Sequence, residues 1–168
     1  SGTAVFQLHD LGYLIISGIA YTNQITKLYF VKTDSAGNLQ WSKIYGDTMT
    51  YFGTRSSDCA VKVNYNNSYV ITGVKGTKSF LLAIDSLGNM LWERTFAMDT
   101  LEVSGSSVDL CNDSGFIVCG DIFDSPIYDT DPQYLYVLKT SKPMVIGITG
   151  NNNTLPNNYR FYQNYPNP

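Results

Sequence analysis

The chain has 168 residues, a length typical of one ordinary domain and too short for two large ones. Its 11 Lys and Arg residues and 14 Asp and Glu residues give a formal net charge of −3. This balance argues against nucleic acid as a partner, because phosphate binding needs a concentrated positive field. A hydrophobic content of 43% excludes a disordered chain, and the scarcity of Glu and Ala (two and six residues, beside twelve Asp) favours strands joined by tight turns over helices.

The amino-terminal residues show neither a signal peptide nor a membrane segment. Residues 1–5 have no basic region and no apolar region of the kind that a signal peptide carries. No stretch of the chain approaches the run of about 18 apolar residues that a membrane span requires. We expect no membrane span, and the missing signal does not decide the compartment because we expect the chain to be a fragment.

Four strand-like runs follow one another in the first 50 residues. They lie near Val5 and at residues 14–17, 28–33 and 39–45, with turn signals between them. The middle runs are apolar nearly throughout, as in strands covered on both faces. The fourth run alternates apolar and polar residues, which is typical of an outer strand with one solvated side.

The second and third parts of the chain repeat this arrangement. Residues 14–18 (Leu-Ile-Ile-Ser-Gly), 69–73 (Tyr-Val-Ile-Thr-Gly) and 116–120 (Phe-Ile-Val-Cys-Gly) are each an apolar run closed by a small residue and Gly. A turn signal and a shorter strand-like run precede each of them. The third copy continues through residues 134–140, after which Lys142-Pro143 replaces the next turn.

The closest match between the first two copies is an Asp-Ser-x-Gly-Asn turn that begins at Asp34 and again at Asp85, 51 residues later. The Asp can accept backbone N–H groups inside a type I turn, and the Gly supplies the positive φ that a G1 bulge needs. We prefer this interpretation to a metal-ligand role for the two aspartates. Trp41 and Trp92 recur with the same spacing, which favours packing between units over ligand binding.

A period of about 50 residues with four strands in each unit is typical of propeller blades. The sequence therefore predicts an all-β fold, a partial β-propeller of about three four-stranded antiparallel blades at residues 1–50, 51–100 and 101–149. A two-sheet sandwich is the rival fold, but it gives no reason for the repeat. Propellers close with about four to eight blades, so three units cannot close a ring alone. We expect further blades in a longer chain, or self-association of copies.

The cysteine and histidine content argues against several kinds of site. Cys59, Cys111 and Cys119 are odd in number, and a hairpin centred on residues 112–115 places Cys111 opposite Phe116 or Ile117 instead of Cys119. We expect the cysteines to be small buried hydrophobic residues. With His9 as the single histidine, a zinc site has too few ligands, and we expect His9 to lie in a solvent-facing turn. No catalytic residue and no phosphate-binding loop is predicted.

One acidic loop is a candidate calcium site. Asp121, Asp124, Asp129 and Asp131 fall within eleven residues, and Ca²⁺ binds several carboxylate and carbonyl oxygens at once. Their spacing does not match an EF-hand, and an ordinary solvated loop is the alternative. Calcium is the one cofactor that we consider, and calorimetric titration with Ca²⁺ tests it.

The carboxyl-terminal residues resemble a known secretion signal. Residues 150–158 are Gly-, Asn- and Pro-rich linker material, and residues 163–168 read Gln-Asn-Tyr-Pro-Asn-Pro. Residues 155–168 resemble the opening of the carboxy-terminal sorting domain of type IX secretion in Bacteroidetes, and the repeats of residues 4–142 resemble the secreted propeller-like repeats that often precede it. The resemblance implies a secreted or cell-surface parent protein, in which residues 150–168 are a linker and the start of a truncated sorting domain.

Three functions stay open. The chain is expected to be a non-catalytic extracellular repeat scaffold or binding module for a protein or glycan, within a larger protein that supplies the remaining blades and the sorting domain. Alternatively, it is the propeller portion of a secreted polysaccharide-degrading enzyme whose catalytic residues lie outside the fragment, or an architectural spacer. Paired carboxylates converging on a central channel would favour the enzyme.

Overall fold

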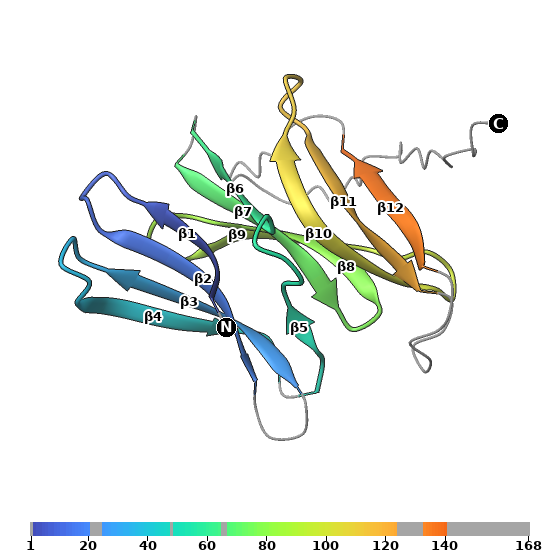
Figure 1. Cartoon of the computed structure of the whole chain (residues 1–168), viewed down its shortest axis with the longest axis horizontal. Helices are drawn as coiled ribbons and strands as arrows, with labels where there is room; N and C mark the ends of the chain where they lie inside the picture. The colour runs from blue at the N-terminus through green and yellow to red at the C-terminus, as the bar shows by residue number, and fades with distance from the viewer. Residues whose placement is uncertain (1, 21–24, 48, 65–66, 124–132, 141–168) are drawn as a thin grey trace, which may run out of the picture.

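The described part of the chain is entirely β-sheet. The computed structural model describes residues 2–20, 25–47, 49–64, 67–123 and 133–140. Within them, twelve strands form three antiparallel sheets and no helix occurs. Figure 1 shows the sheets side by side, in chain order from left to right. The predicted all-β class is confirmed.

The first sheet has four strands in the order in which they follow in the chain. They are β1 (Gly2–Gln7), β2 (Tyr13–Ala20), β3 (Thr26–Thr33) and β4 (Leu39–Tyr45). All four predicted runs form strands, and the fourth has the predicted bounds.

The middle sheet has five strands, because two short strands occupy the position that β1 alone occupies in the first sheet. The strands are β5 (Phe52–Gly53), β6 (Ala60–Val63), β7 (Ser68–Lys75), β8 (Lys78–Ile84) and β9 (Met90–Phe96). Both β5 and β6 pair with β7. The polar segment of residues 54–58 separates them, and Thr72 N–H donates to the Cys59 carbonyl at 2.8 Å where pairing resumes. The expectation of four strands in this unit is corrected to five.

The third sheet has three strands among the described residues. They are β10 (Glu102–Leu110), β11 (Phe116–Phe123) and β12 (Gln133–Lys139). The fourth strand predicted for this unit, after Lys142, falls outside the described residues.

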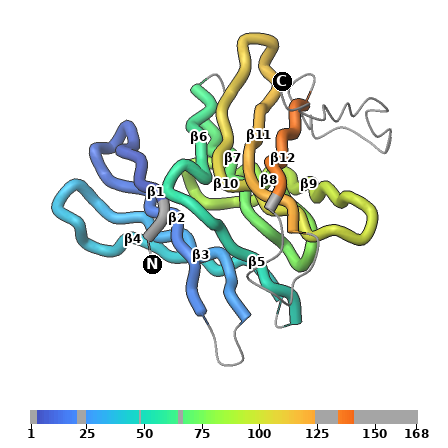
Figure 2. The backbone as a smooth tube through the Cα atoms, turned by 45° about the vertical axis from the view of Figure 1, so that its right-hand side comes forward, coloured from blue at the N-terminus to red at the C-terminus, as the bar shows by residue number. Residues whose placement is uncertain are grey.

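Figure 2 shows the backbones of the three sheets lying next to one another, and two apolar clusters join the sheets face to face. The first cluster joins the first and middle sheets through side chains that are nearly or fully buried: Leu8, Leu14, Ile16, Leu28, Phe30, Phe52, Tyr69, Ile71, Phe80, Leu82 and Ile84. The second cluster joins the middle and third sheets in the same way: Val63, Val70, Leu81, Ala83, Trp92, Phe96, Val103, Val108, Phe116, Val118, Ile122, Tyr136 and Leu138. Burial of this apolar area is the main stabilising contribution to the stack.

The middle sheet is covered on both of its faces. Successive side chains of a strand point to opposite faces, so Tyr69 and Ile71 join the first cluster while Val70 joins the second. Only Lys75, at the end of β7, is not buried in that strand. In residues 13–16 of β2 in the first sheet, half-buried and buried residues alternate instead, because only one face of that sheet is covered.

The hairpin turns define which residues of the three sheets are equivalent. Leu8 N–H donates to the Gly12 carbonyl, and Cys111 N–H donates to the Gly115 carbonyl, both at 2.8 Å. A residue with positive φ lies at the same place in each turn: Leu11 (63°), Asn67 (50°) and Ser114 (62°).

This equivalence corrects the predicted alignment of the repeats by one residue. Tyr13, not Leu14, corresponds to Tyr69 and Phe116. The reason is that the first unit has one residue more than the third between the glycine of the turn and the glycine that closes the apolar run. The extra residue changes which face each following side chain occupies.

With the corrected alignment, equivalent side chains of the three sheets lie on faces that have the same orientation along the stack. We call the face turned to the next sheet along the chain the forward face, and the opposite one the backward face. Leu14 and its equivalent Val70 lie on forward faces, one in each cluster. Tyr69 and its equivalent Phe116 lie on backward faces, again one in each cluster. The sheets therefore stack head to tail.

Candidate functional site

The two repeated turns have the hydrogen bonds that the sequence predicts. The Asp34 carboxylate accepts the N–H groups of Ala36 and Asn38 at 2.9 and 2.8 Å, and Gly37 has a φ of 89°. The Asn38 side-chain amide also donates to Asp34, and these bonds lower the pKa of the Asp34 carboxyl. Asp85 accepts the same set of bonds in the middle sheet. Both carboxylates organise the backbone of a turn, as expected.

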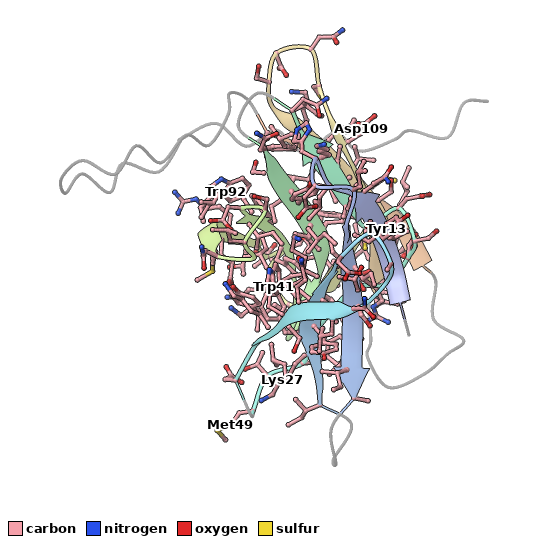
Figure 3. All side chains as sticks on the ribbon, turned by 90° about the vertical axis from the view of Figure 1, so that its left-hand side faces the viewer. Tyr13, Lys27, Trp41, Met49, Trp92 and Asp109 are labelled. Carbon is pink, nitrogen blue, oxygen red and sulfur yellow. The ribbon has the colours of Figure 1, made fainter. Side chains whose placement is uncertain are left out.

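The two tryptophans occupy equivalent places and pack between sheets. Each is paired beside a bulge, Trp41 with Lys32 and Trp92 with Ala83. Figure 3 shows both on the same side of the molecule. The Trp92 ring centroid lies 6.1 Å from that of Phe116 in the third sheet. The Trp41 ring packs against Gly88 in the turn of the middle sheet, so closely that an added Cβ there would lie 2.5 Å from it. Their predicted packing role is confirmed.

Within the described residues the three cysteines form no disulfide, and they differ in exposure. Cys59 is buried, Cys111 is half-buried and Cys119 is exposed. The hairpin is centred one residue from the predicted place, because Leu110, not Cys111, pairs with Phe116. The expectation of three buried cysteines therefore holds for Cys59 alone. Cys119 is exposed because it lies on the forward face of the third sheet, which no described sheet covers.

The candidate calcium loop is described only at its first residue. The Asp121 carboxylate is half-buried and accepts a hydrogen bond from the Ser106 hydroxyl at 3.2 Å. Asp124, Asp129 and Asp131 lie outside the described residues, so the calcium site stays a prediction. Among the residues that the structure describes, no group of three or more His, Cys, Asp and Glu side chains could hold a metal ion. Within the same residues, no helix is long and apolar enough to span a membrane.

A Lys–Asp ion pair ties the hairpin turn to the third strand in two of the sheets. Lys32 Nζ lies 2.5 Å from the Asp10 carboxylate and also donates to the side chain of Gln40. The equivalent Lys139 Nζ lies 2.7 Å from the Asp113 carboxylate. In each pair, the hydrogen bond from lysine lowers the pKa of the aspartate.

The exposure of the two lysines differs because only one of them has a following sheet. The Lys32 side chain is 9% exposed and that of Lys139 is 34% exposed. His9, which is exposed as expected, and Lys32 border a small pocket of about 230 Å³ whose other side is the turn of the middle sheet at Ser86 and Leu87. No such turn is described beyond Lys139.

A concave surface lies where the first strands of the three sheets meet. It is a groove of about 680 Å³ lined by residues of β1, β2, β6 and β10 and of the segment before β6: Ala4, Val5, Phe6, Ile15, Ser57, Asp58, Ala60, Val61, Ser107, Val108 and Asp109. Val108 N–H donates to the Asp58 carbonyl at 3.1 Å and holds the polar segment against β10. The edge strands of three sheets thus contribute to one site.

The groove combines an apolar floor with a polar rim. Val5, Ile15 and Val61 supply apolar surface, while the carboxylates of Asp58 and Asp109 are exposed to solvent. One oxygen of the Asp109 carboxylate accepts the N–H of the next residue, Leu110, at 2.7 Å. Apolar surface with a few hydrogen-bonding groups is the usual lining of a site for a small or extended ligand.

Sequence reasoning did not identify this groove. Asp58 and Asp109 occupy different positions of the repeat, so the repeat contains no signal that links them. They border the same groove because the segment before β6 is held against β10. In comparisons with known proteins, no protein-family model and no curated protein matches this chain.

Proposed function

We propose that this chain is part of an extracellular β-propeller scaffold that binds a protein or glycan ligand in the groove between its first strands. The observation that carries the proposal is the head-to-tail stacking of three sheets with one polarity, each pair joined by an equivalent apolar cluster. Such repetition around an axis is how propeller blades are arranged, and it brings the first strand of every blade to the central channel. In this proposal, the groove lined by β1, β6 and β10 corresponds to part of that channel.

The extracellular location rests on the resemblance of residues 155–168 to a type IX sorting signal. These residues lie outside the described part of the chain. In this proposal, the parent protein is secreted or bound to the cell surface and carries the complete sorting domain. The remaining blades come either from the parent chain or from a second copy of it. Cell fractionation of a bacterium that expresses the parent gene tests the location, and an intracellular parent protein would contradict it.

A glycan array probed with the chain tests ligand binding. The variant Asp109→Asn removes a charged acceptor from the groove, and Asp99→Asn is the matched control, because Asp99 is exposed in the turn between β9 and β10. We expect binding to a subset of oligosaccharides that D109N weakens by about five- to tenfold and D99N leaves unchanged. Equal binding by both variants would place the ligand elsewhere.

The enzyme alternative has one observation in its favour, which is that Asp58 and Asp109 border the same groove. Glycoside hydrolysis uses two carboxylates on opposite sides of the scissile bond. Release of reducing ends from a bound polysaccharide, abolished in both Asp58→Asn and Asp109→Asn, would support this alternative. A chain that neither binds nor cleaves glycans and binds no protein would fit the architectural spacer.

A further inference from the structure

The forward face of the third sheet exposes side chains whose equivalents are buried in the other two sheets. Ile117 is 41% exposed, whereas its equivalents Leu14 and Val70 are at most 1% exposed. Leu135 is 60% exposed, whereas the equivalent Leu28 in the first sheet is fully buried. The exposure of Cys119 and Lys139 on the same face has the same origin. The side chains of this face are equivalent to side chains that pack between sheets elsewhere, but no described sheet lies against it.

The backward face of the first sheet shows the complementary feature. Val5 is 63% exposed, whereas its equivalent Val108 in the third sheet is 5% exposed and belongs to the second cluster. Ile15 and Tyr29 are half-buried, and the equivalents of both residues in the middle and third sheets are buried. One end of the stack is therefore a free forward face and the other a free backward face. A forward face packed on a backward face is the interface that the structure already contains twice.

We infer that two copies of this chain associate head to tail, with the forward face of the third sheet of each copy on the backward face of the first sheet of the other. The contact continues the established packing between the sheets, because it joins a forward face to a backward face as in both clusters. A heterologous contact of this kind forms a ring when its rotation closes. Two copies supply six sheets, which is within the four to eight blades that close a propeller.

The inference rests on the stacking that also supports the proposed function, but it does not depend on a ligand. Association would cover the apolar residues at both ends of the stack, which a monomer leaves in water. Patches of this kind on a soluble protein mark interaction surfaces. Val5 and Ile15 also line the groove of the single chain, so in the dimer the partner copy would cover that part of the groove and leave the part at Asp58 and Asp109.

Sedimentation velocity of the 168-residue chain over a range of concentrations tests the inference. We expect a dimer that dissociates on dilution. Leu135→Glu on the forward face and Val5→Glu on the backward face should each weaken the dimer on the order of a hundredfold, because a charge would enter an apolar contact. Leu87→Glu is the matched control, since Leu87 is 61% exposed in a turn of the middle sheet. Circular dichroism checks that each variant is folded, and folding is expected because all three side chains are exposed in the single chain.

Mixing the two variants distinguishes a head-to-tail contact from a contact between like faces. L135E retains an intact backward face and V5E an intact forward face, so the mixture should associate through one contact although neither variant associates alone. A monomeric wild-type chain would overturn the inference, as would a dimer that survives in V5E or L135E alone. Glycan binding by a chain that stays monomeric would overturn self-association and leave the proposed function in place.

Discussion

At the residue scale, the turns show how one carboxylate can order five residues. Asp34 accepts bonds from two backbone N–H groups and one side-chain amide of its own turn, and Asp85 does the same. The following glycine, Gly37 or Gly88, takes a positive φ that other residues reach only with strain. These bonds are local, which is why the sequence alone predicts them.

The two turn glycines provide a matched test of local strain and packing between sheets. Gly37→Ala meets no atom within 4 Å, so we expect only the strain of the positive φ, about 1 kcal/mol. Gly88→Ala has the same strain and also presses on the Trp41 ring, so its cost should be greater by about 1–3 kcal/mol. Urea unfolding of the two variants measures the difference. Equal free energies of unfolding would mean that Trp41 does not pack against this turn.

The aspartates also predict how stability depends on pH. Hydrogen bonds to their charged forms lower the pKa values of Asp10, Asp34 and Asp113. A carboxyl with a lowered pKa in the folded state stabilises the fold above its unfolded pKa of about 3.9, and this contribution is lost as the pH falls through the folded value. We therefore expect the urea midpoint to be nearly constant near neutral pH and to fall below about pH 4.

The variant Asp113→Asn isolates one of these contributions. It cannot become charged, so its urea midpoint should fall less between neutral and acid pH than that of the wild-type chain. An identical acid dependence in both proteins would show that the Lys139–Asp113 pair adds nothing to stability.

At the scale of the elements, the two tryptophans differ in how deeply they are buried between the sheets. Trp92 is 9% exposed inside the second cluster, whereas Trp41 is half-buried at the edge of the first. We expect Trp92→Ala to lower the free energy of unfolding by about 3–5 kcal/mol and Trp41→Ala by clearly less. Each variant keeps one tryptophan, so its fluorescence reports on that ring, and W41A should emit at the shorter wavelength. A larger loss in W41A would contradict this packing.

Strand positions follow from local pattern, whereas strand breaks and alignment do not. The run at residues 39–45 alternates in polarity and forms β4 with those bounds. The additional strand β5 is not predicted by the sequence, because the polar segment between β5 and β6 is held by a long-range contact with β10 through the Asp58 carbonyl. The one-residue shift of the first repeat depends on turn geometry, since the similarity of the apolar runs alone favours the alignment without the extra residue.

At the scale of the whole molecule, the repeat predicts that sheets stack but not which faces meet. The face that a side chain occupies follows from strand pairing, so the exposure of Cys119 cannot be read from the repeat. The position of Asp58 and Asp109 on one groove likewise follows only from the three-dimensional structure. The propeller remains a proposal, and the sedimentation experiment tests it indirectly, because a closed ring needs the two end faces to be compatible.

The shared polarity of the sheets also has an evolutionary consequence. Because every unit offers the same kind of surface on each side, a duplicated or deleted stretch of about 50 residues leaves the two ends of the array chemically unchanged. Unit number can then vary among descendants of one gene without new interfaces having to arise. The units differ in sequence at equivalent positions, such as Lys32 where the middle sheet has Ala83, while the polarity of the faces is the same.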